Sequence, residues 1–164
     1  MILVGSPGSR LANKASVPFT DLASYPLILP SRPATLPITL EKLAARTASQ
    51  INIADEIDSL DVTKDLVKSS GGFAILAPLA FRAEMQAGHL IAAEIVNPGL
   101  TQSVHVAYQA HWRIPRSIYR QFHRTFYSEL MSWVDCGDWP ATWRLDRDAI
   151  ANDMMSTPAS LSAR

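Results

Sequence analysis

The stretch GGFAILAPLAFRAEMQAGHLIAAEIVNPGL, residues 71–100, places two glycines before an apolar run, a short helix-like segment and a second apolar run ending at Asn97-Pro98-Gly99. Short apolar runs bounded by Gly and Pro predict buried strands. The glycines can close a preceding helix, because a left-handed residue is needed at that position. The stretch therefore predicts a helix end, a strand at 73–76, a helix at 78–87 and a strand at 90–96.

The rest of the chain repeats this alternation of short apolar runs and segments of helical period. Such a pattern predicts an α/β fold with a mainly parallel sheet. The further strands are expected at 2–5, 27–29, 51–57 and 101–109, and the further helices at 20–23, 38–48, 59–70 and 115–134.

Two of these helices carry apolar stripes that we expect to be buried. In the helix that Asp58 or Ser59 caps, the stripe consists of Leu60, Val62, Leu66 and Val67. In the helix at 115–134 it consists of Ile118, Phe122, Phe126, Leu130 and Trp133. Residues from Asp135 onward show no sustained period, which predicts a loosely ordered tail.

Composition excludes several classes of function. The chain has 164 residues, 48% of them apolar, which predicts a packed core. Its 15 basic and 15 acidic residues cancel, which argues against a broad nucleic-acid surface. The single cysteine, Cys136, excludes an internal disulfide and favours a reducing compartment. All apolar runs are far shorter than the ~20 residues of a membrane-spanning helix, and the first residues do not resemble a secretory signal.

Residues with catalytic or metal-binding chemistry do not converge in the sequence. The four histidines lack metal-ligand spacing, and no nucleophile elbow or phosphate loop is present. We therefore expect no catalytic residue, no metal and no cofactor. Glu56 and Asp58 could pair as acid and base, although a capping role for Asp58 is favoured. Aromatic residues interleaved with arginines at 119–127 could stack on single-stranded nucleic acid, although a core stripe is favoured.

Five segments in order resemble the effector-binding region of LysR-type transcriptional regulators. They are DLASYPLILPSRP (21–33), EIDSL (56–60), DLV (65–67) leading to GFAIL (72–76), GHL (88–90) and IVNP (95–98). Their order and separations fit over residues 1–134. The resemblance implies a periplasmic-binding-protein-like type II fold, in which two crossing strands join two α/β lobes around a cleft for a small molecule.

On this resemblance, residues 1–26 and 98–134 form an incomplete first lobe and residues 27–97 form a complete second lobe. Residues 135–164 are a variable C-terminal tail. Family members also carry a winged helix-turn-helix, a linker helix and further first-lobe elements, which this sequence lacks. We therefore expect a truncated regulator, a fragment or a degenerate reading frame.

The family's cleft residues correspond to Pro30, Ser31 and Arg32, and to Asp58 and Ser59. Arg32 can pair with a carboxylate and Ser31 can donate its hydroxyl, while helix N-termini favour anions. The alternatives are a solvated loop arginine and a Ser59 that only caps its helix.

Two positions depart from the family pattern. Pro37 stands where an arginine is frequent, which removes an anion partner. Ser70-Gly71-Gly72 replaces a Gly-apolar-Gly sequence, which we expect to leave a gap in the packing.

The sequence thus indicates a non-catalytic, cytoplasmic sensor that binds a small, anionic metabolite between two lobes. The resemblance implies a homo-oligomer in the full-length protein and DNA contact only through a helix-turn-helix domain absent from this chain. One alternative is a lobe of a solute-binding protein for a transporter, against which the missing signal peptide argues. Another is a small α/β enzyme that uses Glu56, Asp58 or a histidine.

Overall fold

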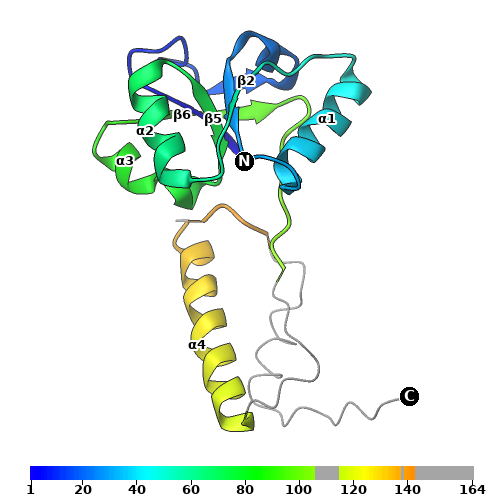
Figure 1. The fold of residues 1–164 in the computed structure, drawn as a ribbon. Helices are drawn as coiled ribbons and strands as arrows, with labels where there is room; N and C mark the ends of the chain where they lie inside the picture. Colours follow the sequence, from blue (N-terminus) through cyan, green and yellow to red (C-terminus); the bar gives the residue numbers. More distant parts are fainter. Residues whose placement is uncertain (106–114, 138, 143–164) are drawn as a thin grey trace. The chain divides into compact units, whose positions relative to one another are not determined.

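A computed structural model of the chain describes residues 1–105, 115–137 and 139–142. The chain forms two compact units, residues 1–104 and 105–164, and each is described by itself. The first unit contains a six-stranded sheet (Figure 1). Its strands are β1 (Ile2–Gly5), β2 (Ser16–Pro18), β3 (Leu27–Leu29), β4 (Ile53–Glu56), β5 (Phe73–Leu76) and β6 (Ile91–Val96). The helices of the chain are η1 (Phe19–Ser24), α1 (Thr35–Thr47), α2 (Leu60–Ser70), η2 (Pro78–Phe81), α3 (Arg82–Gln86) and α4 (Arg116–Asp135).

The strands lie in the order β2-β6-β1-β5-β3-β4. The pairs β2–β6, β3–β4 and β3–β5 are parallel. Strand β1 is antiparallel to both of its neighbours, with Leu3 opposite Ile75 of β5 and Ala93 of β6. The sheet is therefore mixed, and β1 accounts for its departure from the mainly parallel sheet that the sequence predicts.

Strands from both sides of the lobe boundary expected between residues 26 and 27 share this sheet, and the division into lobes stays a prediction. Strands β1 and β2, from the segment 1–26, pair with β5 and β6. The physical reason is that Leu3 and Val4 of β1 are completely buried, which requires sheet neighbours and layers on both sides. Residues 1–26 thus belong to the same sheet as residues 27–97, and the assignment of 98–134 to another lobe stays a prediction.

Side chains alternate between the two faces of the sheet and form two cores. Leu3 of β1 lies in one core, together with Leu40 of α1 and Phe19 of η1. Val4 lies in the other core, together with Val67 of α2. Because successive strand residues point to opposite faces, α1 and α2 cover opposite faces of the sheet, as Figure 1 shows. The unit is an α/β/α sandwich.

The glycines after α2 act as the sequence predicts. Gly71 has a φ of 73°, a left-handed conformation that ends the helix. A Cβ on Gly72 would lie 2.8 Å from Cδ1 of Ile28. At Gly71, the middle residue of Ser70-Gly71-Gly72, a Cβ would meet nothing within 4 Å, so no neighbouring side chain fills the position of the expected gap. Gly72 is required for the close approach of β5 to β3.

The buried face of α2 differs from the predicted stripe. Thr63 and Val67 are buried, one helical turn apart, while Leu66 is half-buried. Leu60 and Val62 are 42% and 47% exposed, so the prediction that they are buried is wrong. Thr63 can take a core position because its hydroxyl donates a hydrogen bond to the Ser59 carbonyl oxygen.

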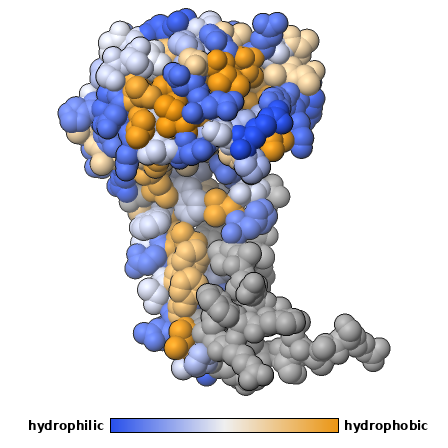
Figure 2. All heavy atoms as spheres, viewed as in Figure 1, coloured by the Kyte–Doolittle hydropathy of each residue, from blue (hydrophilic) through white to orange (hydrophobic). Residues whose placement is uncertain are grey.

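The second unit is described mainly by α4. Among its predicted stripe residues, Phe126 and Leu130 are half-buried, whereas Ile118, Phe122 and Trp133 are 57%, 55% and 42% exposed. Figure 2 shows apolar side chains in a line along this helix. The stripe exists, but the prediction that all of it is buried is wrong.

The remaining predictions concern the segments around α4. Residues 101–105 are not a strand, and the rest of the predicted 101–109 strand lies outside the described residues. Most of the predicted tail also lies outside them. No helix in the described ranges has the length and apolar character needed to span a bilayer.

The Gly5→Ala substitution is expected to lower the free energy of unfolding by about 1–3 kcal/mol, because overpacking of a core is costly. A Cβ at residue 5 would lie 2.8 Å from the Phe73 ring. The matched control is Gly8→Ala, where a Cβ would meet nothing within 4 Å, so a change below about 1 kcal/mol is expected. Urea unfolding of both variants measures this, and equal stabilities would contradict the packing described for β1.

Candidate functional site

Three parallel strands end at one edge of the sheet. Strands β3, β4 and β5 run in the same direction, so their carboxyl ends lie at one edge. The segments that follow β3 and β4 touch there. The Ser31 N–H donates to Oδ1 of Asp58 at 2.8 Å, and the Ile57 N–H donates to the Leu29 carbonyl at 2.8 Å. Four of the five predicted site residues, from Pro30 to Arg32 and Asp58, are thus brought together, and Ser59 follows directly.

Ser59 rather than Asp58 caps α2. Its Oγ accepts from the Val62 N–H at 3.5 Å, which is long for a hydrogen bond. Two shorter bonds, from the Thr63 N–H and hydroxyl to the Ser59 carbonyl, hold the first turn at 3.0 Å. The Ser59 hydroxyl is therefore loosely engaged, while the Asp58 carboxylate is committed to Ser31.

The beginning of α1 has no side-chain cap. Its N-cap is Ala34, whose N–H donates to the Ser31 carbonyl at 3.0 Å. Pro37 occupies the first turn, where a missing N–H is tolerated. The N–H groups at this helix end point away from the helix body and carry its partial positive charge.

Arg32 is the basic residue of the loops that follow β3 and β4, while Arg82 follows β5 in the sequence. Residues 30–40 and 51–63 contain no other Lys or Arg. The Arg32 Nη2 donates to both carboxylate oxygens of Glu41 in α1 at 2.5 Å. The side chains of Arg32 and Glu41 are 65% and 49% exposed, so a ligand in solvent can reach both.

Burial separates the predicted site residues into two groups. Pro30 and Ser31 are half-buried, and Arg32, Asp58 and Ser59 are exposed. The edge can therefore offer backbone N–H groups, a guanidinium and a hydroxyl to a small molecule, and its Asp58 carboxylate as an acceptor. In the part of the chain that the structure describes, no group of three or more His, Cys, Asp or Glu could hold a metal ion.

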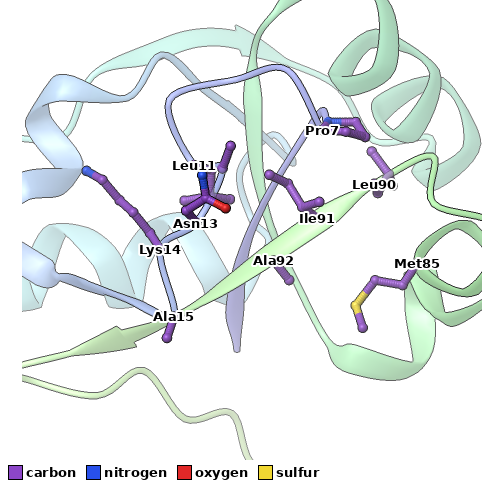
Figure 3. Close-up of a pocket in the computed structure, with 10 residues that line it drawn as sticks. Pro7, Leu11, Asn13, Lys14, Ala15, Met85, Leu90, Ile91 and Ala92 are labelled. Atoms are coloured by element: carbon purple, nitrogen blue, oxygen red, sulfur yellow. The ribbon is translucent and has the colours of Figure 1, made fainter.

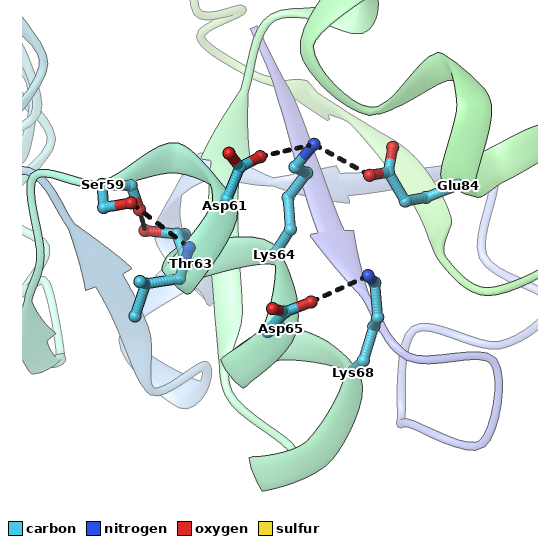
Figure 4. A network of polar contacts seen from close by, with 8 residues as sticks. Ser59, Asp61, Thr63, Lys64, Asp65, Lys68 and Glu84 are labelled. Carbon is cyan, nitrogen blue, oxygen red and sulfur yellow. Dashed lines mark hydrogen bonds and ion pairs between the residues drawn. The ribbon is translucent and has the colours of Figure 1, made fainter.

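A half-buried ion pair fixes α2, the helix that begins at this edge, to α3. The Lys64 ammonium lies 2.8 Å from a Glu84 carboxylate oxygen and 3.2 Å from Asp61 (Figure 4). The side chains of Lys64 and Glu84 are 15% and 17% exposed. Their mutual hydrogen bond lowers the pKa of Glu84 and raises the pKa of Lys64.

An open depression of about 640 Å³ lies at the other end of the sheet. Ile91 and Ala92, where β6 begins, line it together with Leu11, Asn13 and Met85 (Figure 3). Because β6 is antiparallel to β1, which is antiparallel to β5, the start of β6 lies opposite the carboxyl ends of β3 and β4. None of the predicted site residues lines this depression.

Sequence reasoning did not identify Glu41, Lys64 or Glu84. Glu41 is one of many charged residues on exposed helix faces, and it meets Arg32 only because the loop before α1 folds back along the helix. Lys64 and Glu84 are 20 positions apart, and only the packing of α3 beside α2 pairs them. The one feature of the sequence that could have indicated this pair is Glu84, an acidic residue on the short helix expected after β5.

Comparisons with known proteins agree with this fold. The family model for the LysR substrate binding domain matches residues 1–125. A comparison with curated proteins gives no match.

Among solved structures, the effector binding domain of QuiR in complex with shikimate has a TM-score of 0.52 at 20% identity, covering 60% of this chain and 46% of that one. The CcmR regulatory domain of Synechocystis PCC6803, in complex with 2-PG, has a TM-score of 0.51 at 18% identity, covering 57% and 45%. HinK of Pseudomonas aeruginosa, a LysR family transcriptional regulator, has a TM-score of 0.49 at 20% identity, covering 62% of this chain and 34% of that one. The likeness to QuiR and CcmR concerns the fold, and the chain spans less than half the length of all three proteins.

The Glu84→Gln substitution is expected to lower the free energy of unfolding by about 1–2 kcal/mol at neutral pH, because Lys64 loses a half-buried charged partner. Folding lowers the pKa of Glu84, so its contribution is present above the ordinary value of 4.5 and is lost as the pH falls through the folded value. The difference between wild type and variant should therefore shrink in acid.

The control is Asp65→Asn, which breaks an exposed ion pair with Lys68 and should cost less than about 0.5 kcal/mol. Thermal unfolding between acidic and neutral pH checks both values. If Glu84→Gln lowers the free energy of unfolding by the same amount in strong acid as at neutral pH, the ionised Glu84 does not stabilise the fold through Lys64.

Proposed function

The chain belongs to the LysR substrate-binding domain family, and we propose that the edge formed by Ser31, Arg32, Asp58 and Ser59 binds a small anionic effector. The domain is the effector-binding part of a transcriptional regulator. The observation that carries the proposal is the hydrogen bond from the Ser31 N–H to Asp58. It joins the two loops that precede α1 and α2 into one surface.

Three features of this surface favour an anion. In open α/β sheets, ligands bind outside the carboxyl ends of the strands. The carboxyl ends of β3 and β4 lie at this edge. The start of α1 has no side-chain cap, so its N–H groups can donate to a ligand oxygen. Arg32 can supply a charge-assisted hydrogen bond, which is shorter and stronger than a neutral one.

The chemistry of the ligand follows from two exposed side chains of the surface, Arg32 and Asp58. Arg32 after β3 suits a carboxylate or phosphate group, whereas Asp58 accepts hydrogen bonds and suits a hydroxyl group. A small molecule that carries both an anionic group and hydroxyl groups matches these two side chains. The similar structures of QuiR and CcmR hold shikimate and 2-PG, which makes these two compounds suitable probes.

Signal transmission would proceed by differential binding. In a two-lobed sensor, an effector that contacts one lobe arrangement more favourably shifts the equilibrium towards it. In an oligomer that carries DNA-binding domains, effector binding then changes the affinity for DNA, and the coupling free energy measures that change. We propose this mechanism for the full-length protein, in which the second lobe supplies the other wall of the site.

The Arg32→Gln substitution tests the proposal, with shikimate, 2-PG, succinate and inorganic phosphate as probes. We expect at least one probe to raise the thermal unfolding temperature of the wild-type chain, because a ligand that binds only the folded state stabilises it. The substitution should weaken that binding about tenfold or more, since a hydrogen bond to a charged group is lost.

The matched control is Arg46→Gln, an exposed arginine at the opposite end of α1, which should leave the dissociation constant within about twofold. Titration calorimetry measures both. The proposal is contradicted if no probe binds or if the two substitutions weaken binding equally.

A further inference from the structure

Glu41 is hydrogen-bonded to the Arg32 guanidinium, the group that we propose as the partner of a ligand anion. The pair is local in the chain, because Arg32 lies in the loop before α1 and Glu41 lies on the second turn of that helix. Both carboxylate oxygens of Glu41 accept from one nitrogen, Nη2 of Arg32. The predicted ligand-binding arginine is therefore already paired with an acidic side chain of the same protein.

The contact of Glu41 with Nη2 limits how a ligand anion can bind the Arg32 guanidinium. A guanidinium offers two edges for a two-point contact with a carboxylate or phosphate, one formed by Nη1 and Nη2 and the other by Nε and Nη2. Both edges include Nη2. A ligand anion that forms a two-point contact with Arg32 therefore has to share Nη2 with Glu41 or displace Glu41 from it.

The negative charges near Arg32 also lower its affinity for a ligand anion. Arg32 is the only Lys or Arg in residues 30–40 and 51–63, whereas the same segments contain Asp55, Glu56, Asp58 and Asp61. A ligand anion that approaches while Glu41 stays in place would meet a further negative charge beside Arg32. Like charges at this separation lower the affinity.

We infer that Glu41 is a specificity-determining residue that competes with the anionic effector for Arg32. This inference rests on the proposed function of the same edge. Glu41 acts as an internal carboxylate that an effector has to displace. Glu41 weakens the binding of all anions at Arg32, and anions that also contact the helix ends and Asp58 keep enough affinity to displace it.

The magnitude of the effect follows from the exposure of the pair. Arg32 and Glu41 are 65% and 49% exposed, so solvent screens their attraction and the pair is weak enough to be displaced. Its removal should tighten anion binding by about twofold to fivefold, the factor that corresponds to an exposed ion pair.

The test compares four forms of the full chain at constant ionic strength: wild type, Glu41→Gln, Arg32→Gln and the double variant. Each is titrated calorimetrically with shikimate, 2-PG, succinate and inorganic phosphate. We expect Glu41→Gln to tighten binding by the factor above, and this gain to disappear in the Arg32→Gln background. A double-mutant cycle of this kind isolates the pairwise effect.

The matched control is Asp65→Asn, which removes one negative charge from another exposed ion pair, on α2. It should not reproduce the gain. Equal gains from Glu41→Gln and Asp65→Asn would overturn the inference, because net charge alone would then explain them.

The remaining outcomes separate this inference from the function on which it rests. If Arg32→Gln weakens binding while Glu41→Gln leaves it unchanged or weakens it, the competition is refuted and the binding site stands. If no probe binds, or if Arg32→Gln has no effect, the site itself is refuted, and the competition with it.

Discussion

Strand β1 is the constraint on which the structure depends. Leu3 and Val4 are completely buried on opposite faces, so this strand contributes to both cores at once. It lies between β5 and β6, antiparallel to each. Without β1, the pair β6–β2 and the group β5–β3–β4 would have no common backbone partner. Strand β1 therefore fixes the sheet that carries the edge formed by β3 and β4, although β1 contributes no residue to that edge.

This arrangement explains why the loops after β3 and β4 can meet. The two strands are parallel neighbours, so their loops leave from the same edge, but α1 and α2 then cover opposite faces. Only the first residues of each loop can touch, and the contact between Ser31 and Asp58 occurs there. The Lys64–Glu84 ion pair joins α2 to α3 one turn after the start of α2. The site is thus a product of strand direction and not of any single motif.

Much of the fold follows from local sequence patterns. Gly71 ends α2, and the short apolar runs at 27–29 and 73–76 are strands, because period and turn chemistry are local properties. The resemblance to the LysR family is confirmed, as is the α/β fold of periplasmic-binding-protein-like type II. The direction of β1 could not be read, since an apolar run of four residues is the same in either orientation. The exposure of Leu60 and Val62 does not follow from the apolar pattern, because Thr63, the residue after Val62, takes the core position, which its hydrogen bond to Ser59 permits.

The resemblance to the family points to Arg32 and Asp58 as cleft residues, and that role stays a prediction. The hydrogen-bonding partners of these two side chains, Glu41 and the Ser31 N–H, depend on how two loops fold and do not follow from the sequence. We propose that an anion binds at this edge and not at the depression beside Met85. Backbone amide chemical shifts during titration with shikimate and inorganic phosphate distinguish the two places. Binding at the edge should shift the amides of Ser31, Ala34, Thr35 and Ser59 together, whereas shifts confined to Asn13, Met85 and Ile91 would place the anion at the depression and refute the proposal.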